Sequence, residues 1–252
     1  TRTGLLICHV ADIALATVAA EIIYTPIPMD QLPSRRSRRK LIVLTILALF
    51  LLPVAARAAL FAYAHGPLSW RDADWSSTGS LPRATDHKSA RVLIMSGQTG
   101  GWKGTIAVHS WVVLKRENAR TWTRYDVVGW GNPVRTNGWA PDGRWYGNMP
   151  TVLADISGAE AAALIPRIEE AVKGYQFANS GDYRLWPGPN SNTFVATVLR
   201  AIPELGVTMP PNAIGRDYRP YPYLGLTDSG TGIEASLFGV LGVKVGWVEG
   251  IE

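Results

Sequence analysis

Cysteine is almost absent from this sequence of 252 residues, since Cys8 is its only example. A single cysteine excludes an intrachain disulfide, and a cysteine nucleophile would have to be Cys8 itself. The four histidines, His9, His65, His87 and His109, show no metal-ligand spacing, and neither a CxxC nor an HExxH pattern occurs. The sequence therefore predicts no metal ion and no cofactor.

Excess charge is missing from most of the chain. The sequence holds 25 basic and 20 acidic residues, which gives a formal net charge of +5. Five basic residues stand together at Arg35, Arg36, Arg38, Arg39 and Lys40, so the remainder of the chain is neutral. Nucleic-acid binding requires a basic face on the folded domain, and the charge distribution argues against that class. A basic cluster beside an apolar run is instead typical of a membrane boundary.

Residues 29–64 have the organisation of an export signal. A basic region after Met29 leads into the uncharged run from Leu41 to Ala56, and an Ala-x-Ala pattern ends at Ala58. We expect either a cleaved signal peptide or a retained transmembrane helix, because apolar residues after Arg57 extend the run toward the roughly twenty that a bilayer requires. In both cases the basic cluster is cytoplasmic and the following domain is exported.

The rest of the chain divides into three further regions. Residues 1–28 carry Asp12 and Glu21 within an apolar stretch, so we expect translation to start at Met29 and this region to be an over-extended gene prediction. Residues 65–90 are predicted to be a linker, whose Trp70 and Trp75 lie at the lipid interface or dock on the domain. Residues 91–252 are predicted to form the exported domain. A Gly-Ile-Glu triplet at 232–234 returns at 250–252, which predicts that the natural chain continues.

The exported domain is predicted to be α+β, with an antiparallel sheet packed against helices. The expected strands cover residues 92–96, 105–115, 122–129 and 151–156. In the second of these, Val108, Val112 and Leu114 line one face, whereas His109, Trp111 and Val113 line the other. A helix is expected from Ser157 to Lys173, with a Ser157 and Glu160 capping box and a kink at Pro166.

The stretch WPGPNSNTFV, residues 186–195, has the character of a functional site. Its Pro and Gly residues predict a turn, and the four residues that follow are of types that cap helices, namely Asn190, Ser191, Asn192 and Thr193. We therefore expect a helix that begins here and ends before Pro203. Free N–H groups at the start of a helix can hold an oxyanion or activate a nucleophile.

Several motifs resemble the bacterial family called domain of unknown function 3750. They are GWKGTIAVHSWVVLK, YDVVGWG, DGRWYG, WPGPNSNTFVA, AIGRDY and SGTGIEASLFGVLGV, and they run from about Gly97 to the end of the chain. The resemblance implies an inner-membrane protein with a cytoplasmic N-terminus and a periplasmic domain, and it brings no established activity. A more distant similarity is to the permuted papain-like folds of the NlpC/P60 and lecithin-retinol acyltransferase groups and of the periplasmic domain of unknown function 4105.

The papain-like resemblance implies a set of site residues. In those folds a histidine on a central strand precedes a cysteine at the start of a helix, and Ser191 takes the position of that cysteine here. His109 would then accept the proton of Ser191, and Asp126 would orient the imidazole. Asn190 and Asn192 are the candidates for holding the oxyanion. The expected substrate-binding residues are Asn190, Asn192, Thr193, Trp111 and Trp186. The predicted reaction is hydrolysis or acyl transfer at an amide or ester of peptidoglycan or of a lipid.

A structural interpretation of the same residues stays open. In it His109 bonds a backbone carbonyl, Ser191 and Thr193 cap their helix, Asp126 pairs with Arg124 or Arg120, and the tryptophans fill the core. The protein would then be a catalytically inactive domain that binds or organises components of the cell envelope.

Overall fold

The computed structural model describes residues 34–65 and 69–252, which divide into two units at Pro53. Residues 1–28, expected to be an over-extension, lie outside the described residues. The first unit consists of the start of α2 (Arg35–His65), a helix of 31 residues that contains Pro53. Its stretch Arg35–Tyr63 is long and apolar enough to cross a membrane. The expected N-terminal apolar helix is thus confirmed.

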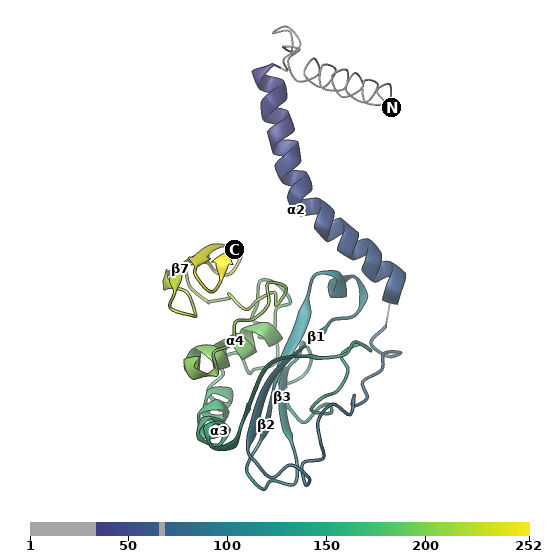
Figure 1. The fold of residues 1–252 in the computed structure, drawn as a ribbon, viewed down its shortest axis with the longest axis vertical. Helices are drawn as coiled ribbons and strands as arrows, with labels where there is room; N and C mark the ends of the chain where they lie inside the picture. The colour runs from purple at the N-terminus through teal and green to yellow at the C-terminus, as the bar shows by residue number, and fades with distance from the viewer. Residues whose placement is uncertain (1–33, 66–68) are drawn as a thin grey trace, which may run out of the picture. The chain divides into compact units, whose positions relative to one another are not determined.

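The second unit is built on a five-stranded antiparallel sheet (Figure 1). The strands are β1 (Arg91–Gln98), β2 (Val108–Lys115), β3 (Thr123–Val127), β4 (Val134–Thr136) and β5 (Thr151–Ser157), in the order β4-β3-β2-β1-β5. The central strands β1 and β2 are buried along nearly their whole length, as their apolar sequences require. β2 begins at Val108 and not at Thr105, because the preceding residues form the short 3-10 helix η2 (Gly101–Thr105).

Two helices cover one face of this sheet, α3 (Gly158–Lys173) and α4 (Ser191–Ala201), as Figure 1 shows. The α4 residues Phe194, Val195 and Val198 are fully buried against the strand residues Val112 and Leu114 and their neighbours. α3 ends at Lys173 as predicted. The predicted capping box at its start is wrong, because the Ser157 side chain makes no capping hydrogen bond.

The opposite face of the sheet is covered by a tryptophan-rich loop, residues 129–150, and by residues that precede β1. Together they bury a second core that contains Trp111, Val113 and Trp145. The Trp75 ring lies 4.9 Å from the Trp145 ring, and the Trp70 ring lies 5.9 Å from that of Trp130. Of the two positions that the sequence left open for these tryptophans, the structure therefore has them docked on the domain. The loop also contains β4, which the sequence did not predict.

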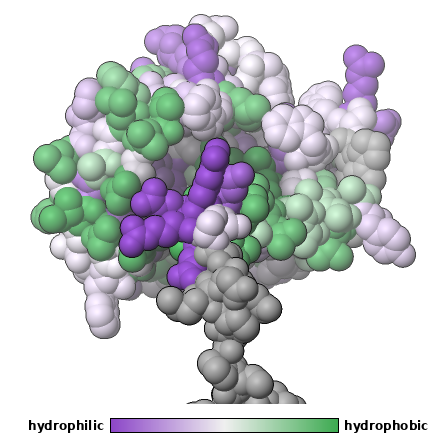
Figure 2. Space-filling model, turned by 90° about the horizontal axis from the view of Figure 1, so that it is seen from above, coloured by the Kyte–Doolittle hydropathy of each residue, from purple (hydrophilic) through white to green (hydrophobic). Residues whose placement is uncertain are grey.

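A second, four-stranded sheet follows in the chain. It is an antiparallel meander of β6 (Tyr223–Leu226), β7 (Gly232–Leu237), β8 (Leu241–Gly246) and β9 (Gly250–Ile251). The two Gly-Ile-Glu triplets lie on either side of β8, where Val245 pairs with both Ile233 and Ile251. Aliphatic side chains gather over this sheet, at the left of Figure 2, and Leu224 and Leu241 are both more than 70% exposed. Its other face buries Glu234 and Lys244.

Candidate functional site

His109 and Asp126 meet on the face of the main sheet that the tryptophan-rich loop covers. His109 lies near the start of β2 and Asp126 lies on β3, and the two strands pair with Val113 opposite Arg124. That register puts His109 and Asp126 on one face, because alternate residues of a strand share a face. The Nε2 atom of His109 lies 2.9 Å from Oδ1 of Asp126, and both side chains are at most 5% exposed.

Arg124 holds the same carboxylate. Its Nε donates to Oδ2 of Asp126 at 2.7 Å and its Nη2 donates to Oδ1 at 2.8 Å, while its Nη1 donates to the carbonyl of Ala140. The guanidinium lies 4.0 Å from the centre of the Trp111 ring, a cation–π geometry. Because Arg124 is fully buried, this arrangement places a compensated ion pair beneath the imidazole.

The imidazole of His109 is also fixed by an aromatic contact. Its ring stacks on that of Trp145, with the centroids 3.6 Å apart and the planes within 4° of parallel. The stack and the hydrogen bond to Asp126 together hold one ring orientation. With Nε2 engaged by Asp126, the ring nitrogen that is left to act on another group is Nδ1.

Burial and charge set the protonation states of this pair. Burial lowers the pKa of His109 from its ordinary 6.5, and the Asp126 carboxylate only partly opposes that effect. Burial acts to raise the pKa of Asp126, but the hydrogen bond from His109 and the charge of Arg124 outweigh it and keep this pKa below its ordinary value. At neutral pH the site therefore contains a neutral imidazole beside an ionised carboxylate, the combination that a general base needs.

α4 begins where the sequence predicted, with Asn190 as its N-cap. The Asn190 side chain accepts hydrogen bonds from the backbone N–H groups of Asn192 and Thr193, and the Thr193 hydroxyl accepts from the N–H of Asn190. The Asn190 amide donates to the carbonyls of Leu185 and Ile214. These bonds attach the start of α4 to two loops that are distant in sequence. Gly215 (φ +93°) adjoins Asn190, and a side chain at this position would collide with the asparagine amide.

These bonds occupy most of the donors that were expected to hold an oxyanion. The amide of Asn192 donates to the carbonyls of Val108 and Ile214, each at 2.9 Å, so neither Asn190 nor Asn192 offers a free side-chain donor. The prediction that one of them supplies such a donor is therefore wrong. Within the described part of the chain, the backbone N–H of Ser191 makes no hydrogen bond.

Ser191 is the first residue of α4 and has a hydroxyl that the fold does not use. The side chain is 4% exposed and makes no hydrogen bond to any of the residues described. Its neighbour Asn192 has a buried Oδ1 atom that also lacks a partner. Buried polar atoms without partners are rare in folded proteins, because desolvating them costs free energy. An acceptor and a hydroxyl are thus available to a ligand at one helix terminus.

One cavity connects these groups. It has a volume of about 280 Å³, near the lower limit of about 300 Å³ for ligand sites, and both His109 and Ser191 line it. Its other polar lining residues include Asn190 and Asn192, whereas its apolar lining comes mainly from η2 and from loops around the sheet. The apolar and aromatic residues of this lining are Trp102, Ile106, Ala107, Val108, Val127, Val128, Trp130, Trp145, Tyr146, Tyr183, Leu185, Trp186 and Ile214.

Two of the predicted substrate-binding residues do not line this cavity. Trp111 is fully buried in the core, where its Nε1 donates to the carbonyl of Pro141. Thr193 is 1% exposed, and its hydroxyl donates to the carbonyl of Gly215. Both residues stabilise the fold around the site. Trp186, in contrast, is 60% exposed and lines the cavity.

Sequence reasoning missed the residues that η2 and the tryptophan-rich loop bring to the site. Trp145 stacks on His109, and Trp102 and Lys103 of η2 line the cavity. The only signal for them was the density of tryptophan and glycine, which gives no spatial position. Among the residues described, no group of three or more His, Cys, Asp or Glu side chains is placed to hold a metal ion.

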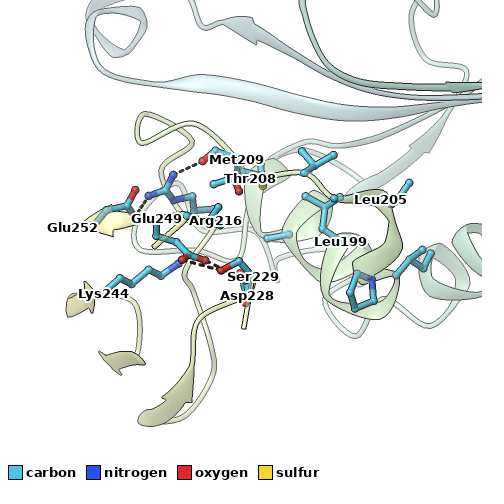
Figure 3. A pocket seen from close by; sticks show the side chains of 16 residues that line it. Leu199, Leu205, Thr208, Met209, Arg216, Asp228, Ser229, Lys244, Glu249 and Glu252 are labelled. Carbon is cyan, nitrogen blue, oxygen red and sulfur yellow. Dashed lines mark hydrogen bonds and ion pairs between the residues drawn. The ribbon is translucent and has the colours of Figure 1, made fainter. Parts of the chain in front are cut away.

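A second cavity of about 280 Å³ lies between the C-terminal half of α4 and the small sheet (Figure 3). Its charged groups are paired with one another or with neighbours: Arg216 contacts Glu252 and the carbonyl of Met209, and Lys244 contacts Asp217. Such a satisfied network stabilises the docking of the small sheet. The cavity that His109 and Ser191 line is therefore the stronger of the two candidates for a reactive site.

Comparison with known families gives one match. Residues 89–218, slightly more than half of the chain, match the family described as "Protein of unknown function (DUF3750)". No curated protein and no solved structure matches the chain. The matched region contains β1 to β5, α3 and α4, and therefore every residue of the His109, Asp126 and Ser191 site.

Proposed function

The chain belongs to the DUF3750 family, and we propose that its exported domain is a serine-dependent hydrolase or acyltransferase of the bacterial cell envelope. Ser191 is the nucleophile, His109 is the general base, and Asp126 is a positioning residue for His109. The substrate bond is an amide or an ester. In this proposal the site is of the permuted papain-like type, with serine in place of cysteine.

The observation that carries this proposal is the shared cavity. A neutral, oriented imidazole and an unbonded serine hydroxyl come from segments 82 residues apart and line one apolar pocket. A structural histidine would satisfy its need for hydrogen bonds within the core, and a structural serine would cap its helix. Here Asn190 caps the helix and Ser191 does not. The hydroxyl therefore has no structural task that the described residues account for.

The chemistry follows from the tautomer. Asp126 accepts the Nε2 proton of His109, which leaves the Nδ1 lone pair to take the proton of Ser191. Ser191 Oγ then attacks the carbonyl carbon of the substrate, and the free N–H of Ser191 supplies one donor to the oxyanion. His109 returns the proton to the leaving group, and water or a second acceptor releases the acyl group from Ser191.

The proposed location follows from α2 and from the charge of its first turns. Five basic residues precede an apolar segment that is long enough to span a membrane. The excess of Lys and Arg on the cytoplasmic side of membrane segments supports a cytoplasmic N-terminus. The catalytic domain would then lie on the periplasmic side of the inner membrane, where peptidoglycan and lipid substrates are both present.

A second candidate function rests on Arg124. Its bidentate ion pair satisfies Asp126 without any catalytic cycle, and its charge opposes formation of an imidazolium at His109. This observation favours a binding or scaffolding domain that keeps the cavity and has no turnover. Such a domain would hold an envelope component through the apolar lining alone.

A fluorophosphonate probe distinguishes the two functions. We expect the purified full-length protein to be labelled on a single serine, with labelling abolished in Ser191→Ala and strongly reduced in His109→Ala. Ser110→Ala is the control, because Ser110 is also buried on β2 but does not line the cavity. Absence of labelling in the wild-type protein across the pH range in which it stays folded would rule out the serine enzyme.

A further inference from the structure

The mouth of the cavity is lined by large apolar side chains that are exposed to water, and exposing such side chains costs free energy. Trp102 is 74% exposed, Trp186 is 60% exposed and Leu185 is 51% exposed, and all three line the cavity. Ile106 and Trp130 add to the same rim. A contiguous apolar rim around a pocket marks a site that contacts an apolar partner. Tryptophan in particular favours the boundary between lipid and water.

The mouth is attached to the C-terminal part of α2. Nε of Arg57 donates to the carbonyl of Thr105 in η2 at 2.9 Å, and Phe61 is buried with an exposure of 8%. A side chain at Gly104 would come within 2.6 Å of the Phe61 ring, so α2 and η2 pack at close range. η2 contributes Trp102 and Lys103 to the cavity. The residues of α2 that follow Pro53 therefore pack directly against the mouth.

Arg57 stands at the end of the uncharged part of α2. It is the first charged residue after the uncharged run Leu41 to Ala56, and a run of 16 residues spans about 24 Å as a helix. A charged side chain at the end of such a run lies at the lipid headgroups and not in the hydrocarbon. When this run crosses a membrane, the long Arg57 side chain is expected to extend its guanidinium toward the lipid headgroups, next to the η2 carbonyl that it contacts.

Two cations accompany the apolar rim. Lys103 lines the cavity, and within the described residues neither Lys103 nor Arg57 forms an ion pair. Unpaired cations at the headgroup level attract anionic lipids. The mouth thus offers apolar side chains for an acyl chain and positive charge for a phosphate.

We propose that the cavity takes the acyl chain of an anionic membrane lipid, which enters from the bilayer surface at η2. The binding of the lipid does not depend on the proposed function. Only the reaction described next rests on that function. In that reaction Ser191 Oγ bonds to the acyl carbon, and the ester C–O bond breaks. His109 carries the proton from Ser191 to the departing alkoxide. Water then cleaves the acyl-serine, which releases a fatty acid and restores Ser191.

The test is photo-crosslinking in a membrane. Full-length protein is reconstituted into vesicles of phosphatidylethanolamine and phosphatidylglycerol, with a trace of phosphatidylglycerol that carries a diazirine at the end of one acyl chain. Mass spectrometry maps the adducts after illumination. We expect adducts on the η2 and rim residues Trp102, Ile106 and Trp186 in addition to α2. Adducts confined to α2, with none on the cavity, would overturn the proposal.

A variant pair makes this test specific. Trp102→Asp combined with Ile106→Asp puts charge on the apolar rim, and we expect adducts on the unsubstituted rim residue Trp186 to fall by about tenfold. The control is Trp247→Asp, since Trp247 is 91% exposed on the small sheet and lies outside the cavity; it should leave cavity adducts unchanged. Circular dichroism and thermal unfolding verify that both variants are folded. Equal adduct yields in the two variants would contradict lipid entry at η2.

The crosslinking result and the enzymatic result are separable. Cavity adducts without fluorophosphonate labelling of Ser191 would mean that the domain binds lipid and has no serine hydrolase activity. Fluorophosphonate labelling of Ser191 without cavity adducts would leave the hydrolase in place and exclude a bilayer lipid as its substrate. Crosslinking in Ser191→Ala measures lipid entry with catalysis removed.

Discussion

Arg124 donates to both carboxylate oxygens of Asp126, at 2.7 and 2.8 Å, while one of the same oxygens lies 2.9 Å from the His109 imidazole. The Asp126 carboxylate is therefore bonded both to a permanent cation and to a titratable ring. Arg124 keeps Asp126 ionised and aligned, and it also limits how much positive charge His109 can accept. This one ion pair therefore affects both the free energy of unfolding of the domain and the basicity of His109.

The first prediction concerns removal of one partner from this pair. Asp126→Asn leaves the buried Arg124 guanidinium without a counter-charge, and we expect the free energy of unfolding to fall by about 3–5 kcal/mol. Chemical denaturation of the protein measures this loss. Glu204→Gln is the matched control, because it breaks a solvent-exposed ion pair with Arg167 and should leave stability almost unchanged. Similar behaviour of the two variants would show that the Arg124 and Asp126 pair is not buried as described.

The second prediction concerns pH. Burial lowers the pKa of His109 below 6.5, so below that pH the unfolded chain binds a proton that the folded site rejects. Stability is thus present in full above pH 6.5 and falls as the pH drops toward the folded-state pKa, by at most about 1.4 kcal/mol per pH unit. Denaturation midpoints measured from pH 7.5 to 4.5 test this dependence. The substitution His109→Gln should remove the contribution of His109 to the pH dependence of stability. If the stability of the His109→Gln variant depended on pH in the same way as that of the wild type, the buried neutral imidazole would be contradicted.

The third prediction compares two helix starts in the same domain. Asn190 caps α4 with its side chain and bonds two loops, whereas the N-cap of α3, Ser157, makes no side-chain bond. We expect Asn190→Ala to cost at least about 1 kcal/mol. Ser157→Ala should change stability by less than about 0.5 kcal/mol. Thermal and chemical unfolding give both values, and a larger loss for Ser157→Ala would refute the capping assignment.

The parts of the fold that depend on local chemistry were predictable from the sequence. α4 begins at Ser191 after an Asn cap because side-chain capping involves only neighbouring residues. Strand alternation predicts that every second residue of β3 shares the face of His109, but a slip of one residue in register changes which residues these are, and the sequence did not fix the register. The register of β2 and β3, continued along β2, puts Trp111 and not His109 directly opposite Asp126, so the contact between His109 and Asp126 is a diagonal one.

The parts that depend on loop conformation were not predictable. Trp145 reaches the His109 ring from a loop whose path is set by long-range contacts, and periodicity carries no information on such a path. The start of a predicted strand was wrong for a similar reason, because Thr105 ends η2, against which Phe61 and Arg57 of α2 pack. Trp111 was expected in the binding site, yet its position on a central strand puts it in the core.

The central claim is that His109 and residue 191 act on one another, and a thiol at position 191 tests it without any substrate. Ser191→Cys in a Cys8→Ser background has one thiol, whose pKa follows from the pH dependence of alkylation by iodoacetamide. A helix N-terminus and an adjacent imidazole both stabilise a thiolate, so we predict a pKa clearly below the usual value of about 8.5. We also predict that this pKa rises when His109→Gln is added. A thiol pKa that is the same with and without His109 would show that the two groups do not interact.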